Sequence, residues 1–389
     1  MKTSVDKSGQ SGGRKILLMG TGDGTIGGTE QIVCRLSRNL SARGHFVETI
    51  FPETPKSPAL LTWSRSHGVM AETTPALRCV AEPHGWNDVL ALRGFLRQSR
   101  PDIVNLHYGN NFISLKDVLA VRLAGVRRCY VTIHQAAPWE SIGAHKQKMT
   151  AQAARLCDQV VAICDATRAL MLEAGIAPGK VPVLYCGFGE PSVLPGRSEA
   201  RRRLGLEEGA FIIVTMASLV PRKGIADLIE AAARVPDPRG DLRLVIGGDG
   251  PERAALEAQA ASTLGPRAVF LGQILGSTAD VYAAADLFAL PSYQEGLPCV
   301  YLEAAFHGIP SVGTRVGGSP EAILDEKTGL LVPPGDPAAL ATAIGRLRDD
   351  PDLRRRLGEA ARVRSLAMFT DAAMTDRYEA LFFEKGRSR

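Results

Sequence analysis

The chain has 389 residues, which is too long for one ordinary hydrophobic core and is typical of two domains. Hydrophobic residues make up 45% of it and charged residues 22%, both ordinary for a globular protein, and the net charge is a mild +5. No stretch approaches the roughly 18 to 20 unbroken apolar residues of a membrane helix, which excludes a membrane-spanning helix.

The start of the chain and the cysteines indicate the compartment. Residues 1–13 are polar and rich in Gly and Ser, without the apolar segment of a signal peptide, and are predicted to be a disordered tail. The seven cysteines are odd in number and form no Cys-x-x-Cys pair, which indicates buried free thiols in a reducing cytoplasm. We therefore expect a cytoplasmic protein without a metal site.

Strand and helix patterns alternate along the first half, as in a parallel sheet covered by helices on both faces. Strands are predicted at residues 14–20, 45–51, 102–107, 129–133 and 159–163. A helix is predicted over residues 29–43, because apolar residues recur there on one helical face. Asp165 is the expected N-cap of the helix that follows the last of these strands.

Residues 186–197 are rich in Gly and Pro and lack periodicity, so the domain linker is placed there. Further strands are predicted at 211–216, 242–246, 268–271, 287–290 and 310–312, and helices at 224–235, 251–263, 298–307 and 371–384. We expect a Rossmann-like domain over residues 14–188 and another over residues 189–370. Two such domains facing each other form a cleft at the carboxyl ends of their strands.

A glycine-rich loop after the first predicted strand contains a formal G-x-G-x-x-G at Gly22, Gly24 and Gly27. Three interpretations stay open. The loop forms a dinucleotide site with Glu48, about 20 residues further on, or the glycines only make a tight turn. In the third, the amides of Gly27 and Gly28 at the helix N-terminus face a phosphate or sugar across the cleft. The motifs of the second half favour the third.

A basic pair follows the first strand of the second domain. Arg222 and Lys223 come after Ser218 and just before a predicted helix. Arg offers a planar bidentate fork and Lys a point charge, so the pair can hold a diphosphate at the end of the sheet. The alternative is a solvated helix start, but cations there oppose the helix macrodipole, which favours an anionic ligand nearby.

Two glutamates flank the start of a predicted helix whose first residue is expected to be Pro298. Glu303 lies on an otherwise apolar segment, where a carboxylate is costly to bury unless it accepts hydrogen bonds, and a ribose diol supplies two donors. Glu295, on the preceding loop, can reach the hydroxyls of a sugar. A structural salt bridge is the alternative interpretation.

Two further elements complete the set. Gly317 and Gly318 precede a short helix expected to begin near Pro320, whose free amides form a site for a phosphate. His134 follows a predicted strand of the first domain and is expected to project into the cleft, the alternative being a packed side chain.

Taken together, these residues resemble the retaining glycosyltransferases of family 4, which have the GT-B fold. The resemblance covers residues 15–384, and its most specific element is the E-x7-E pattern of Glu295 and Glu303. Its other elements, in the family's usual order, are GGTE (residues 27–30), His134, Arg222-Lys223, GGDGP (247–251), LG (271–272) and GGSPE (317–321). The family often has Asn-Gly before the linker, where this chain has Cys186-Gly187, which puts the hinge hydrogen bonding in doubt.

The resemblance implies two Rossmann-like domains that face an interdomain cleft, with the C-terminal helix, residues 371–389, crossing back to the first. The first domain would bind the acceptor and the second the nucleotide-sugar. It implies catalytic roles for His134, Arg222, Lys223 and Glu295. The implied donor site consists of Gly27, Gly28, Ser218, Arg222, Lys223, Gln273, Ile274, Glu295, Gly296, Leu297, Glu303 and Gly318.

Within that site, Glu303 would bind the ribose, and residues around Gln273 and Ile274 would frame the base. Arg222 and Lys223 would hold the diphosphate, and His134 would contact the sugar near the reacting centre. The implied reaction is metal-independent transfer of a hexose from a nucleotide diphosphate donor to an acceptor hydroxyl, with retention and front-face attack. UDP is the first choice of nucleotide, and no cofactor is expected.

The acceptor belongs to glycan, glycolipid or natural-product biosynthesis, and other functions stay open. A sugar-nucleotide epimerase shares the fold, and a NAD-dependent oxidoreductase would rest on the first glycine loop. A non-catalytic sugar-nucleotide-binding protein would not need both glutamates and both basic residues. The weakest predictions are the acceptor contacts, placed at Tyr108, Asn110, Asn111 and Trp139.

Charge is unevenly divided between the halves. Residues 1–190 contain 22 Lys and Arg against 15 Asp and Glu, whereas the remainder contains 24 against 26. The excess includes Arg93, Arg97, Arg100, Arg122, Arg127 and Arg128. It is either a solvated surface or an attraction for an anionic acceptor or an anionic membrane face. No nucleic acid is expected as a partner.

Overall fold

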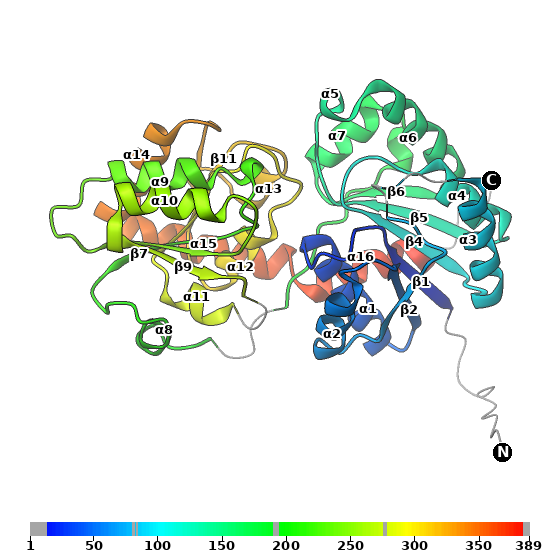
Figure 1. Ribbon diagram of the computed structural model, residues 1–389, viewed down its shortest axis with the longest axis horizontal. Helices are drawn as coiled ribbons and strands as arrows, with labels where there is room; N and C mark the ends of the chain where they lie inside the picture. Colours follow the sequence, from blue (N-terminus) through cyan, green and yellow to red (C-terminus); the bar gives the residue numbers. More distant parts are fainter. Residues whose placement is uncertain (1–13, 80–81, 83–84, 190–193, 275–277, 384–389) are drawn as a thin grey trace, which may run out of the picture.

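The computed structural model describes residues 14–79, 82, 85–189, 194–274 and 278–383. Two parallel sheets of six strands lie side by side, each covered by helices on both faces (Figure 1). The two predicted Rossmann-like domains are thus confirmed. The predicted tail, residues 1–13, lies outside the described residues, as do residues 190–193 of the predicted linker.

The first sheet has the strand order β3-β2-β1-β4-β5-β6. Its strands are β1 (Lys15–Gly20), β2 (Phe46–Pro52), β3 (Ala71–Thr74), β4 (Ile103–Tyr108), β5 (Arg128–Ile133) and β6 (Gln159–Ala162). Its helices are α1 (Gly28–Ala42), α2 (Ser57–Ser66), α3 (Trp86–Ser99), α4 (Leu115–Leu123), α5 (Trp139–Ile142), α6 (Ala144–Leu156), α7 (Asp165–Glu173) and η1 (Pro178–Lys180).

The second sheet repeats this order as β9-β8-β7-β10-β11-β12. Its strands are β7 (Phe211–Met216), β8 (Leu242–Gly247), β9 (Ala268–Gly272), β10 (Leu287–Leu290), β11 (Ser311–Thr314) and β12 (Gly329–Val332). The helices are α8 (Arg197–Arg203), η2 (Pro221–Lys223), α9 (Ile225–Arg234), α10 (Arg253–Thr263), η3 (Gly265–Arg267), α11 (Ala279–Ala284), α12 (Cys299–Phe306), α13 (Ser319–Ala322), α14 (Pro337–Asp349), α15 (Pro351–Met368) and α16 (Asp371–Phe383).

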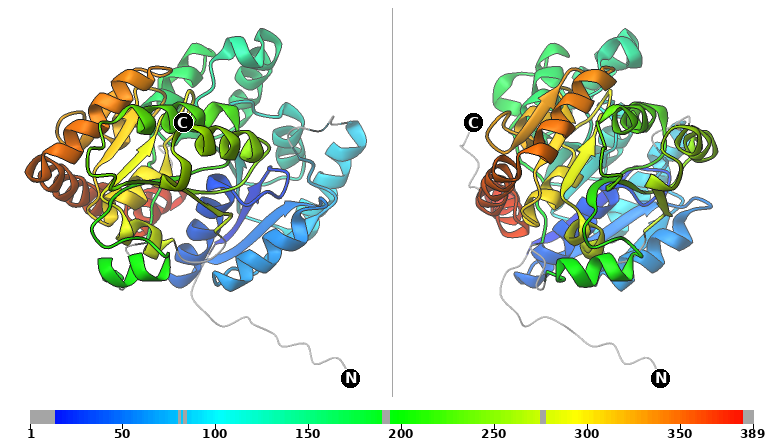
Figure 2. Two further views of the ribbon diagram at one scale, coloured as in Figure 1. Left: turned by 60° about the vertical axis from the view of Figure 1, so that its left-hand side comes forward. Right: turned by 90° about the vertical axis from the view of Figure 1, so that its left-hand side faces the viewer.

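The last helix returns to the first domain, as the resemblance implied. In Figures 1 and 2 the chain runs through α15 along the second domain and then through α16 beneath the first sheet. There α16 packs against α1, and its residue Tyr378 lies 3.2 Å, hydroxyl to hydroxyl, from Thr132 of β5. Tyr130 of β5 donates to the carbonyl of Leu381 at 3.0 Å. This helix therefore covers part of one face of the first sheet, beside α1.

Two chain crossings join the domains, and they lie next to each other. Phe188, just before the linker, pairs with Thr370, just before α16, through a parallel bridge. Its amide donates to the carbonyl of Phe369 at 2.8 Å. Apolar contact continues across the boundary, because Leu302 and Phe306 of α12 belong to the same buried cluster as α1. The domains thus share a packed base beneath the cleft.

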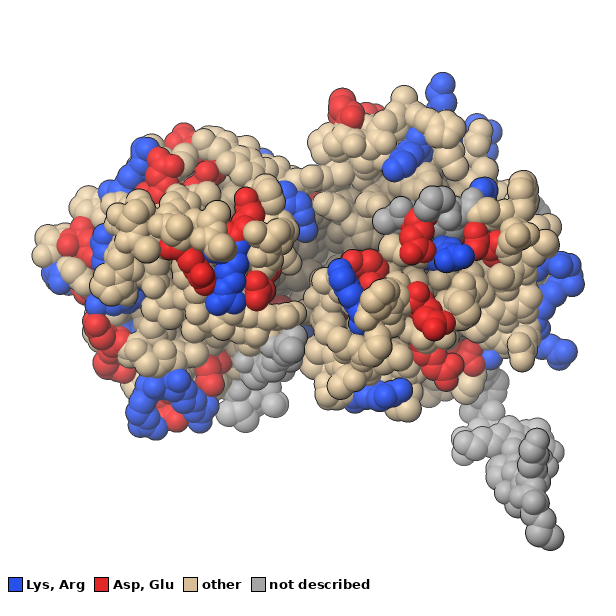
Figure 3. Space-filling model, in the orientation of Figure 1, with Lys and Arg blue, Asp and Glu red and all other residues tan. Residues whose placement is uncertain are grey.

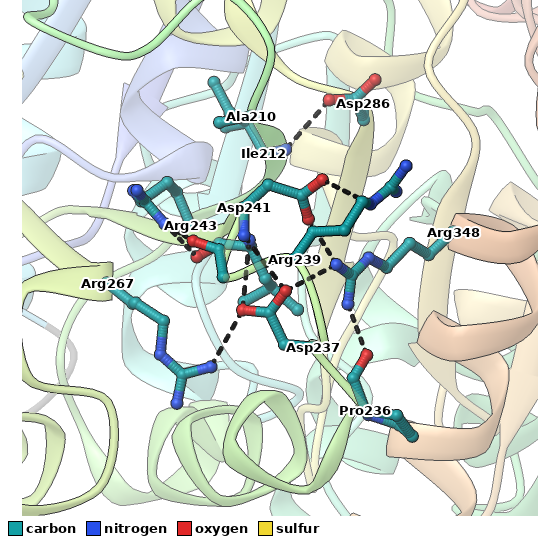
Figure 4. A network of polar contacts seen from close by, with 12 residues as sticks. Ala210, Ile212, Pro236, Asp237, Arg239, Asp241, Arg243, Arg267, Asp286 and Arg348 are labelled. Carbon is teal, nitrogen blue, oxygen red and sulfur yellow. Dashed lines mark hydrogen bonds and ion pairs between the residues drawn. The ribbon is translucent and has the colours of Figure 1, made fainter.

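A network of ion pairs closes the amino edge of the second sheet (Figure 4). Arg348 of α14 is buried, and it donates to Asp237 at 2.6 Å and to the carbonyl of Pro236 at 2.5 Å. Asp237 also accepts from Arg267 at 3.2 Å. Each buried charge therefore has opposite charges and hydrogen bonds around it, as burial requires. The network lies at the edge away from the cleft, and its role is structural.

Two predicted helix starts are each wrong by one residue. Cys164, not Asp165, is the N-cap of α7, and its sulfur accepts from the amide of Thr167. Pro298 has extended backbone and is the N-cap of α12 rather than its first residue. The helix α7 thus begins one residue earlier than expected and α12 one residue later, because sequence alone does not fix the residue at which the extended backbone ends. Among the helices of the described ranges, none is both long and apolar enough to cross a bilayer.

Candidate functional site

In both sheets the chain reverses direction across the sheet between its first and fourth strand. These points lie between β1 and β4 and between β7 and β10, and ligands of doubly wound sheets bind at the carboxyl ends there. The loops that follow these strands approach each other across the interface. A Cβ atom on Gly296, after β10, would collide with the carbonyl oxygen of His134, after β5. The backbones of the two domains therefore touch beside the predicted site.

A cavity of about 560 Å³ opens between the domains, where the surface is hollowed (Figure 3). From the first domain it is lined by Thr25, Ile26, Gln31, Cys34, Arg35, Arg38, Trp63, His67, Phe188 and Gly189. From the second it is lined by Met216, Ala217, Ser218, Gly247, Gly248, Asp249, Gln273, Ile274, Thr278, Ala279, Val300, Glu303, Phe306 and His307. Four predicted donor-site residues, Ser218, Gln273, Ile274 and Glu303, thus share one cavity.

Glu303 reaches this cavity from α12. Burial raises the pKa of its carboxyl, and the Arg35 guanidinium on the opposite wall acts in the other direction. The turn after β8 shapes the floor beside it. Gly248 has a φ of +129°, and a Cβ there would collide with the carbonyl of Ala217, so only glycine fits. The GGDGP motif therefore brings bare backbone to the cavity wall.

The predicted catalytic residues of the second domain meet at the switch point of its sheet. Lys223 follows β7 and Glu295 follows β10, and Nζ of Lys223 lies 2.5 Å from Oε1 of Glu295. Ser292 donates to the same carboxylate oxygen at 2.6 Å. Burial lowers the pKa of Lys223, and Glu295 opposes that effect. The salt bridge considered as the alternative is thus present for Glu295, between residues on two neighbouring loops at the switch point of the second sheet.

Arg222 is exposed beside this pair, and its guanidinium lies 3.4 Å from the carbonyl of Gln294. Gly224, the N-cap of α9, has a φ of +64° and packs on the carbonyl of Pro291. That close approach fixes the loop after β7 against the loop after β10. Of the two cations on this loop, Arg222 is exposed and Lys223 is mostly buried.

The GGSPE segment contacts both the second-domain loop and the first domain. The amide of Gly318 donates to the carbonyl of Gly296 at 2.7 Å, so this amide is engaged within the protein. Glu321 in α13 accepts from the amides of Asp165 and Ala166, at 2.8 and 3.1 Å, which are the first two residues of α7. A carboxylate from one domain therefore caps a helix of the other.

The first glycine loop leads into α1 with an open approach. A Cβ on Gly28 would meet no heavy atom within 4 Å, so space is free beside the helix N-terminus. Glu30 accepts from the amide of Gly27 at 3.1 Å, and burial raises its pKa to about 7. Glu48 lies instead on β2, paired with Lys15 at 2.8 Å. It is too near the amino edge of the sheet for the ribose contact of a dinucleotide site.

His134 follows β5, and its side chain is only partly exposed. Its Nε2 lies 2.9 Å from Nδ1 of His107 on β4, and the two rings stack with centroids 5.2 Å apart. Burial lowers the pKa of His134 to about 3. His107 was missed by the sequence analysis, because strand pairing, and not any motif, brings the two histidines together.

Three of the four residues predicted to contact the acceptor are buried inside the first domain. Tyr108 is fully buried and donates to Asp117 at 3.0 Å, and Trp139 is buried and donates to the carbonyl of Leu170 at 2.8 Å. Asn111 is also fully buried, bonded to the carbonyl of Ala137. These three side chains hold the first domain together, and only Asn110 of the predicted set reaches the surface.

Several cavity residues were not found from the sequence. Arg35 and Arg38 lie three residues apart on α1 and so share a helical face, which the predicted helix over 29–43 could have revealed. Trp63 and His67 stack with centroids 4.3 Å apart at the end of α2, a helix that was not predicted. In the part of the chain that the structure describes, no group of three or more His, Cys, Asp or Glu could hold a metal ion.

Comparison with known proteins agrees with this geometry. Residues 26–188 match the family model described as "Glycosyltransferase Family 4", and residues 196–364 match "Glycosyl transferases group 1". The D-inositol 3-phosphate glycosyltransferase of Kribbella flavida is 30% identical over 88% of this chain and 87% of its own length. The enzyme of that name from Corynebacterium diphtheriae is 28% identical over 93% and 90%.

The solved structure of Anabaena Alr3699/HepE in complex with UDP superimposes with a TM-score of 0.81 at 21% identity. The match covers 95% of this chain and 99% of that one, so the likeness spans both domains and the cleft. It confirms the GT-B fold. With the two family models covering the two domains and a 30% identical relative along nearly the whole length, the chain belongs to glycosyltransferase family 4.

Proposed function

We propose that this glycosyltransferase moves a hexose from UDP-hexose to an acceptor hydroxyl with retention of configuration. The observation that carries the proposal is the position of Glu303 in the interdomain cavity and of the Lys223–Glu295 pair on the adjoining loops of the same switch point. In this proposal the nucleoside occupies the cavity at Glu303, and the sugar extends from it toward the Lys223–Glu295 pair. The similar fold of Alr3699/HepE, solved with UDP-glucose, supports the choice of donor.

The cavity fits the nucleoside end of such a donor. Gln273 and Ile274 frame the base, and Glu303 accepts from the ribose hydroxyls, whose two donors compensate for its burial. Arg35, on the opposite wall, closes the pocket from the first domain. Binding the nucleotide thus joins the two domains through one ligand.

The diphosphate would lie over Ser218 and Lys223. A lysine ammonium has three N–H donors, and Glu295 uses one of them, so the others stay available to phosphate oxygens. As the bond between sugar C1 and phosphate oxygen breaks, negative charge grows on the leaving diphosphate, and Lys223 and Arg222 stabilise it. The leaving phosphate oxygen takes the proton of the acceptor hydroxyl, which attacks C1 from the same face.

This mechanism needs neither a second carboxylic acid on the opposite face of the sugar nor a metal ion. A retaining glycosidase would need two carboxyl groups about 5 Å apart across the sugar. Glu295 instead bonds to Lys223 and Ser292 and holds the donor sugar with the Gly296 and Leu297 amides. We propose that the reaction proceeds without a divalent cation.

Binding and turnover measurements with individual nucleotide sugars test this proposal. UDP and UDP-hexoses should raise the melting temperature, and transfer or slow hydrolysis should yield the same anomeric configuration as the donor, followed by NMR. EDTA should leave the rate unchanged. Stabilisation by NAD alone, or turnover that EDTA abolishes, would contradict the donor or the metal-free mechanism respectively.

Arg35 and Arg38 line the cavity, but three of the arginines that make up the basic excess of the first half lie away from it. Arg100, Arg127 and Arg128 lie at the amino ends of β4 and β5, the edge away from the cavity. On the face drawn in Figure 3, basic and acidic residues are interspersed over both domains. An anionic acceptor is therefore not attracted by these particular arginines.

We propose instead a peripheral contact with anionic membrane through α3. Trp86 and Leu90 are 66% and 57% exposed on one helical face, and Arg97 is exposed on the same face. Each basic residue near an anionic surface contributes on the order of 1 kcal/mol to binding. Salt weakens this attraction because it is screened beyond the Debye length, about 10 Å at 0.1 M.

Vesicle sedimentation tests this contact. The protein should sediment with anionic vesicles at low salt, and the double variant Trp86→Ala/Arg97→Ala should sediment less than the parent protein. Equal, negligible sedimentation with anionic and neutral vesicles would dismiss the contact.

A further inference from the structure

His107 and His134 form a pair at the carboxyl end of the first sheet. His107 on β4 is fully buried, and its Nδ1 lies 2.9 Å from Nε2 of His134. The rings are nearly parallel, with an angle of 29° between their planes. A neutral imidazole carries one N–H, so one ring must donate this hydrogen bond and the other must accept it.

Both rings are neutral in the folded protein. Burial lowers the pKa of His107 well below its ordinary value, the nearby His134 lowers it further, and burial lowers the pKa of His134 to about 3. The pair therefore has two arrangements at neutral pH, which differ only in which ring donates.

The surroundings of His107 favour one arrangement. Its Nε2 is buried and has no hydrogen-bond partner among the residues that the structure describes. If His107 accepted at Nδ1, its proton would sit on Nε2 as a buried, unsatisfied N–H, and such orphaned donors are rarer than orphaned acceptors. The arrangement in which His107 accepts is therefore disfavoured, which puts its proton on Nδ1.

We propose that His107 donates from Nδ1 to Nε2 of His134 and so fixes His134 in its Nδ1–H tautomer, with that N–H as the donor to a hydroxyl of the bound sugar. The Nδ1 of His134 has no hydrogen-bond partner within the described ranges, and the residue as a whole is partly exposed. The backbone of His134 packs on Gly296, next to Glu295. His107 is therefore a positioning residue. The contact with the sugar rests on the proposed function, whereas the tautomer does not.

The tautomer can be read directly by long-range ¹H–¹⁵N NMR of the full-length protein labelled at its seven histidines. His134 is assigned by comparison with His134→Asn. We expect the Nδ1–H form in the parent protein. In His107→Leu, Nε2 of His134 loses its hydrogen-bond donor. The NMR signals of His134 should therefore shift toward those of a mixture of both tautomers. In His107→Asn the side-chain amide supplies an N–H donor where His107 has Nδ1. The His134 signals should therefore match those of the parent protein.

The functional readout separates positioning from folding. In His107→Leu, kcat with a hexosyl donor should fall roughly tenfold, the fold-change of one neutral hydrogen bond. The affinity for UDP, which lacks the sugar, should stay unchanged. His107→Asn should restore kcat, and the exposed His145→Leu on α6 should match the parent protein.

An Nε2–H form of His134 in the parent protein would overturn the proposal, as would an unchanged His134 pattern in folded His107→Leu. If His107→Leu does not fold, the tautomer of the parent protein decides alone. A parent protein that transfers no hexose while showing the Nδ1–H form would refute the proposed function and leave the tautomer assignment standing.

Discussion

At the residue scale, Glu303 illustrates why a buried carboxylate identifies a ligand contact. Its pKa is raised by burial, and Arg35 across the cavity, together with the side chains of Tyr282 and Thr278, opposes that effect only in part. Such a group is costly to leave in an apolar setting, and hydroxyl donors from a ribose reduce that cost. Nucleotide binding thus recovers part of the free energy that burial of this carboxylate costs in the empty site.

Replacing Glu303 with Ala should weaken UDP binding by about 1.5–3 kcal/mol, the worth of a hydrogen bond to a charged group. Glu303→Gln, which keeps one acceptor, should lose less. Isothermal titration calorimetry measures both, with Glu230→Ala, at an exposed ion pair on α9, as the matched control. Unchanged affinity in folded Glu303→Ala would remove the ribose contact.

Lys223 is expected to act on the rate rather than on nucleotide binding alone. Lys223→Ala should lower turnover by about 100-fold or more, if its ammonium stabilises the leaving group as an oxyanion donor does. The change also leaves the buried Glu295 without its partner, so a loss of stability could imitate a loss of catalysis.

A double variant separates the two effects. Lys223→Met/Glu295→Gln carries no unpaired buried charge and should recover thermal stability, yet remain slow. Arg234→Ala, at an exposed ion pair on α9, serves as the control. Near-normal turnover in folded Lys223→Ala would rule out the role in leaving-group stabilisation.

At the element scale, the capping of α1 couples pH to stability. The carboxyl of Glu30 has a pKa of about 7 in the folded protein against 4.5 as its ordinary value, so the folded state holds the proton more tightly. The resulting stabilisation is complete below pH 4.5 and is lost as the pH rises to 7.

Glu30→Gln keeps an acceptor for the Gly27 amide but does not titrate. Its stability relative to the parent protein should therefore rise with pH, by about 3 kcal/mol between pH 4.5 and pH 8. Urea unfolding of the two proteins at several pH values measures this. A constant difference across that range would show that the Glu30 pKa is not raised.

Helices with a periodic apolar pattern and strands with a continuous apolar run were predicted well. Two short strands at the edges of the sheets were not predicted. The strands β7 and β10 have the predicted bounds, because their residues form continuous apolar runs. The missed strands, β3 and β12, are four-residue edge strands; β6, of the same length and also at an edge, was predicted from its apolar run. An edge strand pairs on one side only, and its short sequence carries little signal.

The same distinction applies to the site. Glu303 and Lys223 were predicted as site residues because their segments follow strands, and loops after parallel strands converge at the sheet edge; of the two, Glu303 lines the cavity. Arg35 and His107 were not predicted, because their place depends on helix packing and on the pairing of β4 with β5. Tyr108 and Trp139 were misjudged as acceptor contacts, because a polar atom on an aromatic ring does not tell from sequence whether the fold itself uses it.

At the scale of the whole molecule, Glu321 of the second domain accepts hydrogen bonds from α7 of the first domain and so links the two. Tyr185, near the linker, donates to the same carboxylate at 3.1 Å. Hydrogen bonds to a charged group are each worth about 1.5–3 kcal/mol, enough to shift a balance between open and closed cleft.

Glu321→Ala should therefore open the cleft, which increases the radius of gyration measured by small-angle X-ray scattering and raises the KM for donor. Glu326→Ala, whose ion pair with Arg346 lies within the second domain, is the control. If scattering and KM match the parent protein in folded Glu321→Ala, this carboxylate does not hold the domains together.

The return of α16 to the first domain has a consequence for how the protein is made. On the ribosome, residues up to Phe188 emerge while the face of β5 at Tyr130 and Thr132 still lacks its cover. The second domain, by contrast, has all its strands and helices through α15 before α16 is synthesised. The domain that is translated first is thus completed last. Any nascent chain stopped before Asp371 carries an open apolar sheet face, which makes it the species most prone to aggregate or to recruit chaperones.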